Sequence, residues 1–385
     1  MEVYLDNAAT TKPQMRVIET MTEAMEAIYG NPSSLHRKGL EVERRVKEIR
    51  KNLGKEIKGK PSEIIFTSGG TEGNNLAISG ALAHLKDKRP RIITLPTEHK
   101  SVLNTFKEWE KNGYEVCYSK VDNKGRVDLR QLQELINKET ALVSISYINN
   151  ETGVIQPISE IGQIIRESGS GAKFHVDAVQ AFGKIDIDVK KSNIDMLTAS
   201  AHKIHGPKGV GFLYVKEGTP LKPLFFGGAQ ERSIRPGTEN TPGILGFGAG
   251  IKELSRDKRK VYDSVLAHKE YFVQQIIDGI EEVAYIKGEF GEESPYILNV
   301  SFIGVKSEVL LHSLESKGIF VSSGSACNAQ DKSHSHVLEA LGLEYDIIDS
   351  AIRFSFSRYT TKEELDYTLG QLKVIVKDLR MIMKR

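Results

Sequence analysis

A lysine and an aspartate stand where both could act on one cofactor. Lys203 lies in the run AHKIHGPKGV at 201–210, directly after an apolar segment, and Asp177 follows an earlier apolar segment. At two strand exits this pair suits pyridoxal phosphate (PLP). The lysine forms a Schiff base, and the aspartate keeps the pyridine nitrogen protonated so that the ring accepts electrons. A single lysine in a Gly/Pro loop is more often a surface residue, so the assignment of Lys203 depends on the other candidate residues of the site.

Two further strand exits offer groups for the phosphate and the ring. Gly69, Gly70 and Thr71 follow the apolar run 64–67, and backbone N–H groups at such a turn form a phosphate site. Thr71 can cap the helix that follows. His99, after the apolar run 91–95, could stack on a flat ring and relay protons. Each segment alone also suits an ordinary turn or a helix-capping loop.

Amides and arginines supply the remaining polar groups. Asn149 and Asn150 follow the apolar run 142–147 and offer directed donors, although Asn and Gly also favour plain turns. Gln180, three residues after Asp177, could donate to the ring's phenolic oxygen, while Ser200 and His202 beside Lys203 add donors to the phosphate. Arg353 in a strand-like run could bind a carboxylate, or belong to an edge salt bridge. The loop 227–240 carries paired arginines that could close over an anion, or it is a solvated loop.

The two cysteines differ in their surroundings. Cys117 lies in an apolar run and resembles a structural cysteine, whereas Cys327 ends the run SSGSAC and precedes a polar segment. Cys327 is therefore a candidate nucleophile, with its thiolate as the reactive form. The pairs His202/His205 and His334/His336 have no cysteine or carboxylate at the usual ligand spacing, so no metal is expected.

Length and composition bound the class of protein. The chain has 385 residues, 39% hydrophobic and 27% charged, with a net charge of +2. This balance gives no electrostatic case for nucleic acid or an anionic membrane. No apolar run is long enough to span a membrane, the N-terminus does not resemble a signal peptide, and two cysteines make no disulfide framework. A cytoplasmic protein is expected.

The candidate residues follow strands of an expected α/β domain. Apolar runs and helical patterns alternate from 64 to 216, which favours a mostly parallel sheet with ligands at the strand carboxyl ends. A long helix over 241–283, strands at 296–302, 319–321 and 352–355, and a closing helix at 362–381 indicate a smaller α+β domain. We expect a large domain over 13–256. The small domain is expected to combine 1–12 with 257–385 and to carry the Cys327 loop.

Together these residues resemble the cysteine desulfurases, which are class V aminotransferase-like enzymes of fold type I. The resemblance runs from YLDNAAT at 4–10 through GNPSS at 30–34 to Arg353, and SSGSAC at 322–327 is similar to the long-loop, NifS/IscS-like group. It implies conversion of L-cysteine to L-alanine, with PLP as the cofactor. The released sulfur is kept as a persulfide on Cys327.

The resemblance also implies a role for each site residue. Lys203 binds PLP covalently, Asp177 and Gln180 tune the ring, and His99 stacks on it. The phosphate ligands would be Gly70, Thr71, Ser200, His202 and Thr238. Thr238 would come from the partner subunit, which implies a homodimer with shared sites. Asn150 and Arg353 would hold the substrate carboxylate.

One departure and three alternatives remain. Relatives often have proline where this chain has His334, which affects the preference for a sulfur-accepting partner rather than the chemistry. That partner could be an iron–sulfur scaffold or a tRNA-thiolating enzyme. Transamination needs no presented cysteine, selenocysteine lyase activity would use the same pocket, and a non-catalytic sulfur-transfer scaffold would not need Lys203, His99 and Cys327.

Overall fold

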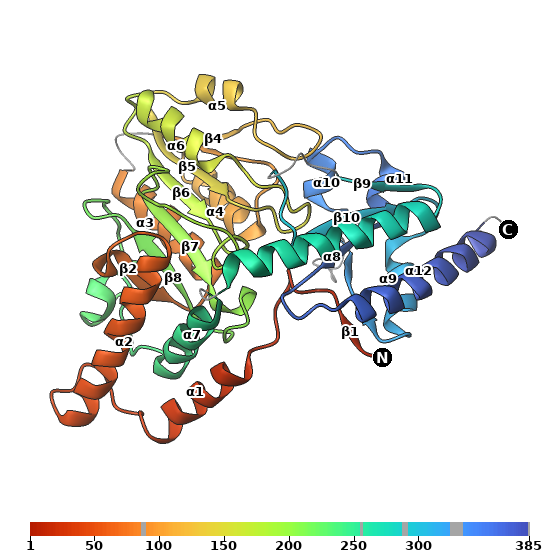
Figure 1. Ribbon diagram of the computed structural model, residues 1–385. Helices are drawn as coiled ribbons and strands as arrows, with labels where there is room; N and C mark the ends of the chain where they lie inside the picture. The colour runs from red at the N-terminus through yellow and green to blue at the C-terminus, as the bar shows by residue number, and fades with distance from the viewer. Residues whose placement is uncertain (86–89, 255–256, 287–291, 324–333, 384–385) are drawn as a thin grey trace.

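The computed structural model describes residues 1–85, 90–254, 257–286, 292–323 and 334–383. A larger part built on a seven-stranded sheet and a smaller part built on a four-stranded sheet lie side by side, and α8 runs from one to the other (Figure 1). The helices are α1 (Met15–Glu26), α2 (Arg37–Glu56), α3 (Gly70–Leu85), α4 (Lys100–Lys111), α5 (Leu129–Leu135), α6 (Ile158–Glu167), α7 (Thr241–Leu254), α8 (Lys258–Gly279), α9 (Ser307–Glu315), α10 (His336–Ala340), α11 (Tyr345–Asp349) and α12 (Lys362–Met383).

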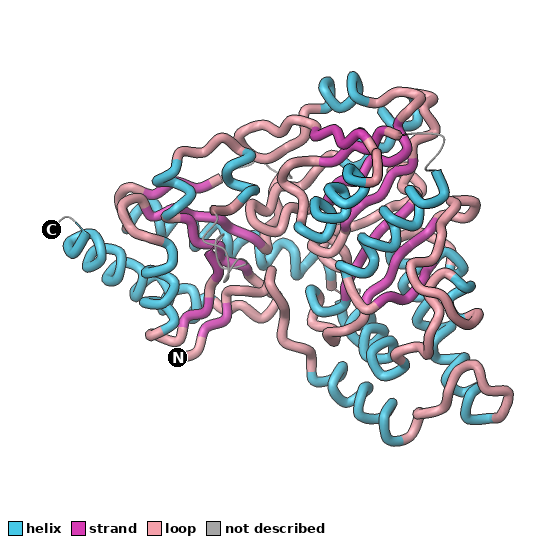
Figure 2. Tube along the Cα trace, turned by 180° about the vertical axis from the view of Figure 1, so that it is seen from behind, coloured by secondary structure: helices cyan, strands magenta, loops and turns pink. Residues whose placement is uncertain are grey.

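The seven-stranded sheet confirms the expected α/β class. Its order is β2 (Ile64–Thr67), β8 (Gly211–Val215), β7 (Met196–Ser200), β6 (Lys173–Asp177), β5 (Thr140–Ser146), β3 (Arg91–Thr94) and β4 (Glu115–Tyr118). The pairs from β7 to β4 are parallel, and β8 alone runs against its neighbours. Helices cover both faces (Figure 2), so the central strands β5 and β7 are buried at every residue rather than at alternate residues.

The smaller part is antiparallel. Its sheet has the order β12 (Ser322–Ser323), β13 (Ala351–Ser355), β10 (Ile297–Phe302) and β9 (Val283–Tyr285). Helix α9 packs against β12 and β13, and α12 packs against α8 and α9. The N-terminal strand β1 (Val3–Tyr4) pairs in parallel with β11 (Ile319–Phe320), and the chain then crosses to α1 in the larger part (Figure 1). Residues 5–12 therefore pass between the two parts. The exact domain boundaries stay a prediction.

One expected element is wrong. The helix expected over 241–283 is two helices, α7 and α8, followed by strand β9. Asp257, directly before α8, has φ −133° and ψ 24°, which is not helical backbone. Ser and Asp favour helix starts over helix interiors because their side chains compete for nearby backbone groups. The sequence pattern missed the division into two helices because apolar residues recur with helical spacing both before and after it.

The described helices include none with the length and apolar character that crossing a bilayer requires. The helix α12 is long enough, but charged residues recur along its whole length.

Candidate active site

The site lies where the parallel strands end. Asp177 is the last residue of β6, and its sheet neighbours in register are Ser146 on β5 and Thr198 on β7. Ser200 is the last residue of β7 and pairs with Gly211, which in turn pairs with Thr67 at the end of β2. The sheet thus brings the expected residues of three strands to one edge, as the alternation of strands and helices predicted.

At one end of this edge, α3 begins directly after β2. Gly69 has φ +152°, a conformation open to glycine, and a Cβ at Gly70 would lie 2.8 Å from Val179 Cγ2. Ser200 Oγ is buried and has no hydrogen-bond partner in the part of the chain that the structure describes. A helix N-terminus beside an unpaired hydroxyl fits a phosphate group. Thr71 is exposed at this helix start, and His202 Nδ1 lies 3.2 Å from Thr10 Oγ1.

The paired arginines of the 227–240 loop do not both face an anion. Arg235 binds Glu72 in the first turn of α3, with Nε to Oε1 at 2.8 Å. Although burial pushes the pKa of Glu72 upward, hydrogen bonds from Arg235 and Ser68 hold it below its usual value. Arg232 is exposed. Arg235 is a salt-bridge residue here, and the closing of the pair over an anion stays a prediction.

Asp177 and His99 define the middle of the site. Asp177 is buried, and its carboxylate accepts hydrogen bonds from Asn74 Nδ2 (2.7 Å) and the Val179 N–H (2.9 Å). His99 caps α4 by accepting from the Ser101 N–H. His99 is exposed, yet the protein around its ring lowers its pKa by removing hydration; nearby Asp177 opposes this and Lys203 reinforces it. An accessible, neutral ring is what stacking on a cofactor requires.

Lys203 faces the N-terminal segment. It lies at the end of the short 3-10 turn Ala201–Lys203, and its Nζ donates to the carbonyl oxygens of Ala8 (2.5 Å) and Ala9 (2.6 Å). Gln180 Nε2 donates to the same Ala8 oxygen (2.9 Å). The carbonyls of residues 8 and 9 thus hold the lysine and the glutamine at the same edge. Gln180 keeps a second amide hydrogen for the phenolic oxygen expected as its acceptor.

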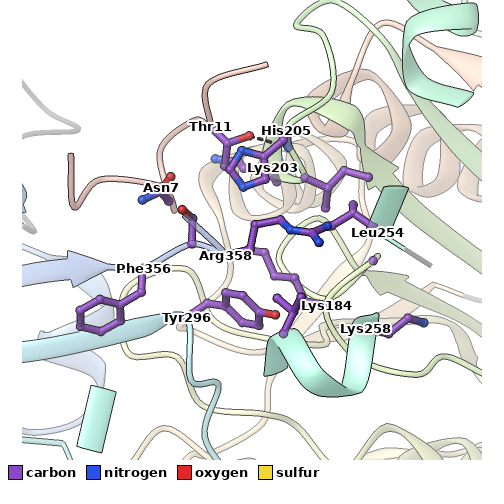
Figure 3. A pocket seen from close by; sticks show the side chains of 14 residues that line it. Asn7, Thr11, Lys184, Lys203, His205, Leu254, Lys258, Tyr296, Phe356 and Arg358 are labelled. Atoms are coloured by element: carbon purple, nitrogen blue, oxygen red, sulfur yellow. Dashed lines mark hydrogen bonds between the residues drawn. The ribbon is translucent and has the colours of Figure 1, made fainter. Parts of the chain in front are cut away.

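A cavity beside Lys203 is rich in cations (Figure 3). Lys184 in its wall is buried and donates to Gln180 Oε1 (3.1 Å). Burial, with the positive charges of Lys203 and Arg353, lowers the pKa of Lys184 to about 7. Because the amine faces Oε1, the Gln180 amide turns its nitrogen toward Ala8 and the site. Sequence reasoning missed Lys184, which lies four residues beyond Gln180 in a non-helical turn and belongs to no motif.

Arg353 forms the far end of the site. It lies on β13, and its guanidinium donates to Asn150 O (2.9 Å) and to Asp6 Oδ1 (2.9 Å). Its Nε is buried and has no partner among the described residues, which suits a further anionic group. Of the two adjacent amides, Asn149 is a turn residue, because its Oδ1 accepts the backbone N–H groups of residues 151 and 152. Only Asn150 stays a candidate for binding.

Of the remaining expected residues, Thr238 and Cys327, the structure describes only Thr238. Thr238 is exposed on the loop before α7. Cys327 lies outside the described residues. Cys117 is half-buried on β4, an edge strand separated from β6 by β3 and β5. Burial, with the neighbouring Glu115, raises the pKa of its thiol, which disfavours the reactive thiolate.

Glu98 is a second residue that the sequence did not indicate. It is fully buried, its Oε1 accepts from the Ser146 N–H (2.8 Å) and hydroxyl (3.1 Å), and its Oε2 has no partner within the described ranges. Burial raises its pKa to about 8, and the Asp177 charge adds to the rise although the Ser146 hydrogen bonds oppose it. At neutral pH Glu98 is a protonated acid next to the site.

Comparison with known proteins identifies the family of this chain. The class V aminotransferase family model matches residues 3–368, and the chain belongs to that family. It is a PLP-dependent enzyme of fold type I. A protein of Trichormus variabilis named cysteine desulfurase 2 is 44% identical over 380 residues, covering 99% of this chain and 94% of its own. The solved structure of a NifS-like protein, 36% identical, superposes with a TM-score of 0.93 over 98% of this chain and all of its own. A structure titled SspA in complex with cysteine is 34% identical, with a TM-score of 0.81 over 93% of this chain and all of its own.

Proposed function

We propose that this chain is a cysteine desulfurase that converts L-cysteine to L-alanine and keeps the sulfur as a persulfide on Cys327. The relatives named cysteine desulfurase and the related structure with bound cysteine support this substrate. In the overall step the substrate C–S bond breaks and an S–S bond forms to Cys327. The thiol protons go to the substrate carbon and to the new persulfide, so no outside oxidant or reductant is needed.

One observation carries the proposal: both ends of the segment that contains Cys327 are fastened at the site. Before it, Ser322 pairs with Arg353 in the sheet. After it, the Ser335 hydroxyl donates to Glu151 Oε2 (2.5 Å), and His336 Nε2 donates to the Glu98 carbonyl (2.9 Å). Glu151 and Glu98 are the chain neighbours of Asn150 and His99. The described residues on either side of this segment are thus held at the site, which supports the proposed role of Cys327.

Each residue then has a task. PLP, when bound, supplies an electron-accepting ring that stabilises negative charge on the substrate. Arg353 and Asn150 hold the substrate carboxylate, and Lys203 holds the cofactor and moves a proton at its Nζ. Asp177 keeps a negative charge at the pyridine nitrogen, His99 covers the ring, and Gln180 donates to it. The phosphate rests on the start of α3 with Gly70, Thr71, Ser200 and His202.

The proposal includes a homodimer in which Thr238 of each subunit reaches the phosphate of the other. Apolar side chains stand exposed near the loop that bears Thr238: Leu35 is 93% exposed and Phe226 is 89% exposed. Residues 32–33 and 229–232 line a groove, and Leu35 and Phe226 lie two and three residues from these stretches along the chain. Large apolar residues around a groove mark an interaction surface, and a second copy would cover them.

The sulfur then passes to an acceptor protein, an iron–sulfur scaffold or a tRNA-thiolating enzyme. We place the reaction in the cytoplasm, where thiols stay reduced.

The test is product stoichiometry. Purified enzyme with L-cysteine and a thiol reductant should yield alanine and sulfide in equal amounts, and Lys203→Ala should yield neither. Lys208→Ala, at an exposed lysine in the same loop, is the matched control and should keep full turnover. Pyruvate in place of alanine, or full activity of Lys203→Ala, would contradict the proposal. Activity on selenocysteine alone would support the lyase alternative.

A further inference from the structure

Asn74 on α3 has a buried side-chain amide that donates hydrogen bonds to two residues, Asp177 and Ser101. It is 1% exposed. One hydrogen of its Nδ2 goes to Asp177 Oδ2 (2.7 Å) and the other to Ser101 Oγ (2.9 Å). Both donors of the amide are therefore in use, one on the β6 side of the site and one on the α4 side.

The carbonyl of the same amide is left without a partner. Asn74 Oδ1 is buried and accepts no hydrogen bond from any residue that the structure describes. An unpaired buried carbonyl is unfavourable, but turning the amide round would set this oxygen against the Asp177 carboxylate, which can only accept. The Asp177 charge thus fixes the amide orientation, and the unpaired oxygen is its consequence.

The second hydrogen of Asn74 is relayed to His99, where the backbone N–H of Ser101 also donates. Ser101 Oγ accepts from Asn74, so the hydroxyl hydrogen is free to point to His99 Nδ1, 2.8 Å away. The Ser101 backbone N–H points to the same nitrogen (3.1 Å). A nitrogen that receives two hydrogens must be the unprotonated one, so the proton of the neutral ring lies on Nε2.

We propose that Asn74 is a positioning residue for both Asp177 and His99. One of its hydrogens orients the Asp177 carboxylate. The other, relayed by the Ser101 hydroxyl, supplies one of the two donors that hold His99 as the Nε2–H tautomer. The functional consequence rests on the proposed function, in which these two groups act on the PLP ring. Asn74 itself touches neither cofactor nor substrate.

The sharpest variant is Asn74→Asp, which keeps the shape and replaces the amide donor with an acceptor. The Ser101 hydroxyl would then turn to the new carboxyl group, so that His99 Nδ1 would lose one of its two donors and keep the Ser101 backbone N–H. Asn75→Asp is the matched control. It makes the same charge change one position along α3, where the amide bonds to Thr71 O and accepts from Thr105.

The measurement is nitrogen NMR of histidine-labelled full-length protein, with PLP bound. The wild type and Asn75→Asp should show His99 protonated on Nε2. In Asn74→Asp the Nδ1 nitrogen should lose its hydroxyl donor, so its chemical shift should change, and the pH midpoint of His99 should rise by about one unit. The other charged groups near this ring, Lys100, Lys203 and His336, are unchanged in both variants.

Two further variants keep the test decisive. In a Ser101→Ala background the effect of Asn74→Asp on His99 should shrink several-fold, because the relay is gone while the added charge remains. Asn74→Ala adds no charge, and the pH dependence of the absorbance of bound PLP should still differ from that of the wild type. It covers the case in which Asn74→Asp does not fold.

An unchanged Nδ1 chemical shift and pH midpoint of His99 in folded Asn74→Asp would overturn the inference, as would an absorbance titration of bound PLP that matches the wild type. Neither readout depends on turnover. A failure of the proposed desulfurase activity would therefore leave them intact, and the two claims can fail separately.

Discussion

At the scale of single residues, the site is built from buried polar groups whose protonation follows from their neighbours. His175, inside β6, shows the simplest case: burial alone lowers its pKa to about 3, so it is a neutral link between Ser144 and Thr198. Glu98 shows the opposite case, since burial keeps it protonated at neutral pH. Asp177 lies between these groups with donors on its oxygens. Burial and donors thus assign acid, base and neutral roles within a few strands.

The Glu98 environment makes protein stability depend on pH. Its pKa rises from 4.5 to about 8 on folding, so between these values the folded state keeps a proton that the unfolded state has released. The free energy of unfolding therefore falls as pH rises through this window. Glu98→Gln cannot lose a proton, so its stability relative to wild type should improve from about pH 5 to about pH 8.

Urea unfolding of both proteins at the two pH values measures this difference. Glu43→Gln, at an exposed carboxylate on α2, is the control and should show no comparable trend. A constant difference between Glu98→Gln and wild type across the window would mean that Glu98 is ionised in the folded protein.

At the scale of elements, a left-handed turn holds the loop that presents Thr238. Residues 231, 232 and 233 all have positive φ, between 44° and 60°, which non-glycine residues adopt at a cost in free energy. The Glu231 carboxylate compensates by binding the Arg50 guanidinium (2.6 and 2.8 Å) and the Phe66 N–H (2.9 Å). This buried ion pair ties the loop to α2 and to β2.

Removing one charge of this pair should be costly. Glu231→Gln leaves Arg50 partly buried with its charge uncompensated, so the free energy of unfolding should fall by about 3 kcal/mol. Glu43→Gln breaks the exposed pair Lys47–Glu43 on the same helix and should cost less than about 0.5 kcal/mol. Denaturant titration of both variants checks the contrast. Equal losses would show that the turn does not depend on the ion pair.

The sequence predicted the helices and strands better than it predicted which side chains contact one another. Apolar runs such as 64–67, 196–200 and 211–215 are strands with the expected bounds, because both-face burial leaves a continuous apolar signal. The helix break before α8 was missed because periodicity continues on both sides. Lys184 was missed because its burial comes from the fold. Asn74 and Glu98 were missed because their roles come from contacts with residues distant in the chain, such as Asn74 with Asp177, 103 positions away. No local pattern encodes such a contact.

At the scale of the whole molecule, the dimer should be inseparable from cofactor binding. Phe226→Asp places a charge in the proposed interface, so the protein should become monomeric at micromolar concentration and lose PLP on dilution. Ile382→Asp is the control, since Ile382 is 67% exposed on α12, at the other end of the molecule (Figure 1). Sedimentation with absorbance detection reports mass and bound PLP together. A monomeric wild type that retains PLP would contradict the shared site.

Thr238→Ala separates the two effects. The dimer should persist, because the exposed apolar residues are untouched, while PLP should dissociate more readily than from wild type. Dialysis followed by absorbance measures the retained cofactor. Retention equal to that of wild type would show that Thr238 does not reach the phosphate.

The central claim is that the sulfur of the substrate arrives on Cys327. The direct measurement is mass spectrometry of the enzyme treated with L-cysteine, digested without reductant. One added sulfur should appear on the peptide that contains Cys327 and none on the peptide that contains Cys117, whose thiol pKa is raised by burial. Cys327→Ser should keep the PLP absorbance and gain no sulfur, because a serine hydroxyl is a far weaker nucleophile than a thiolate. Added sulfur on Cys117, or rapid desulfuration by Cys327→Ser, would contradict the account.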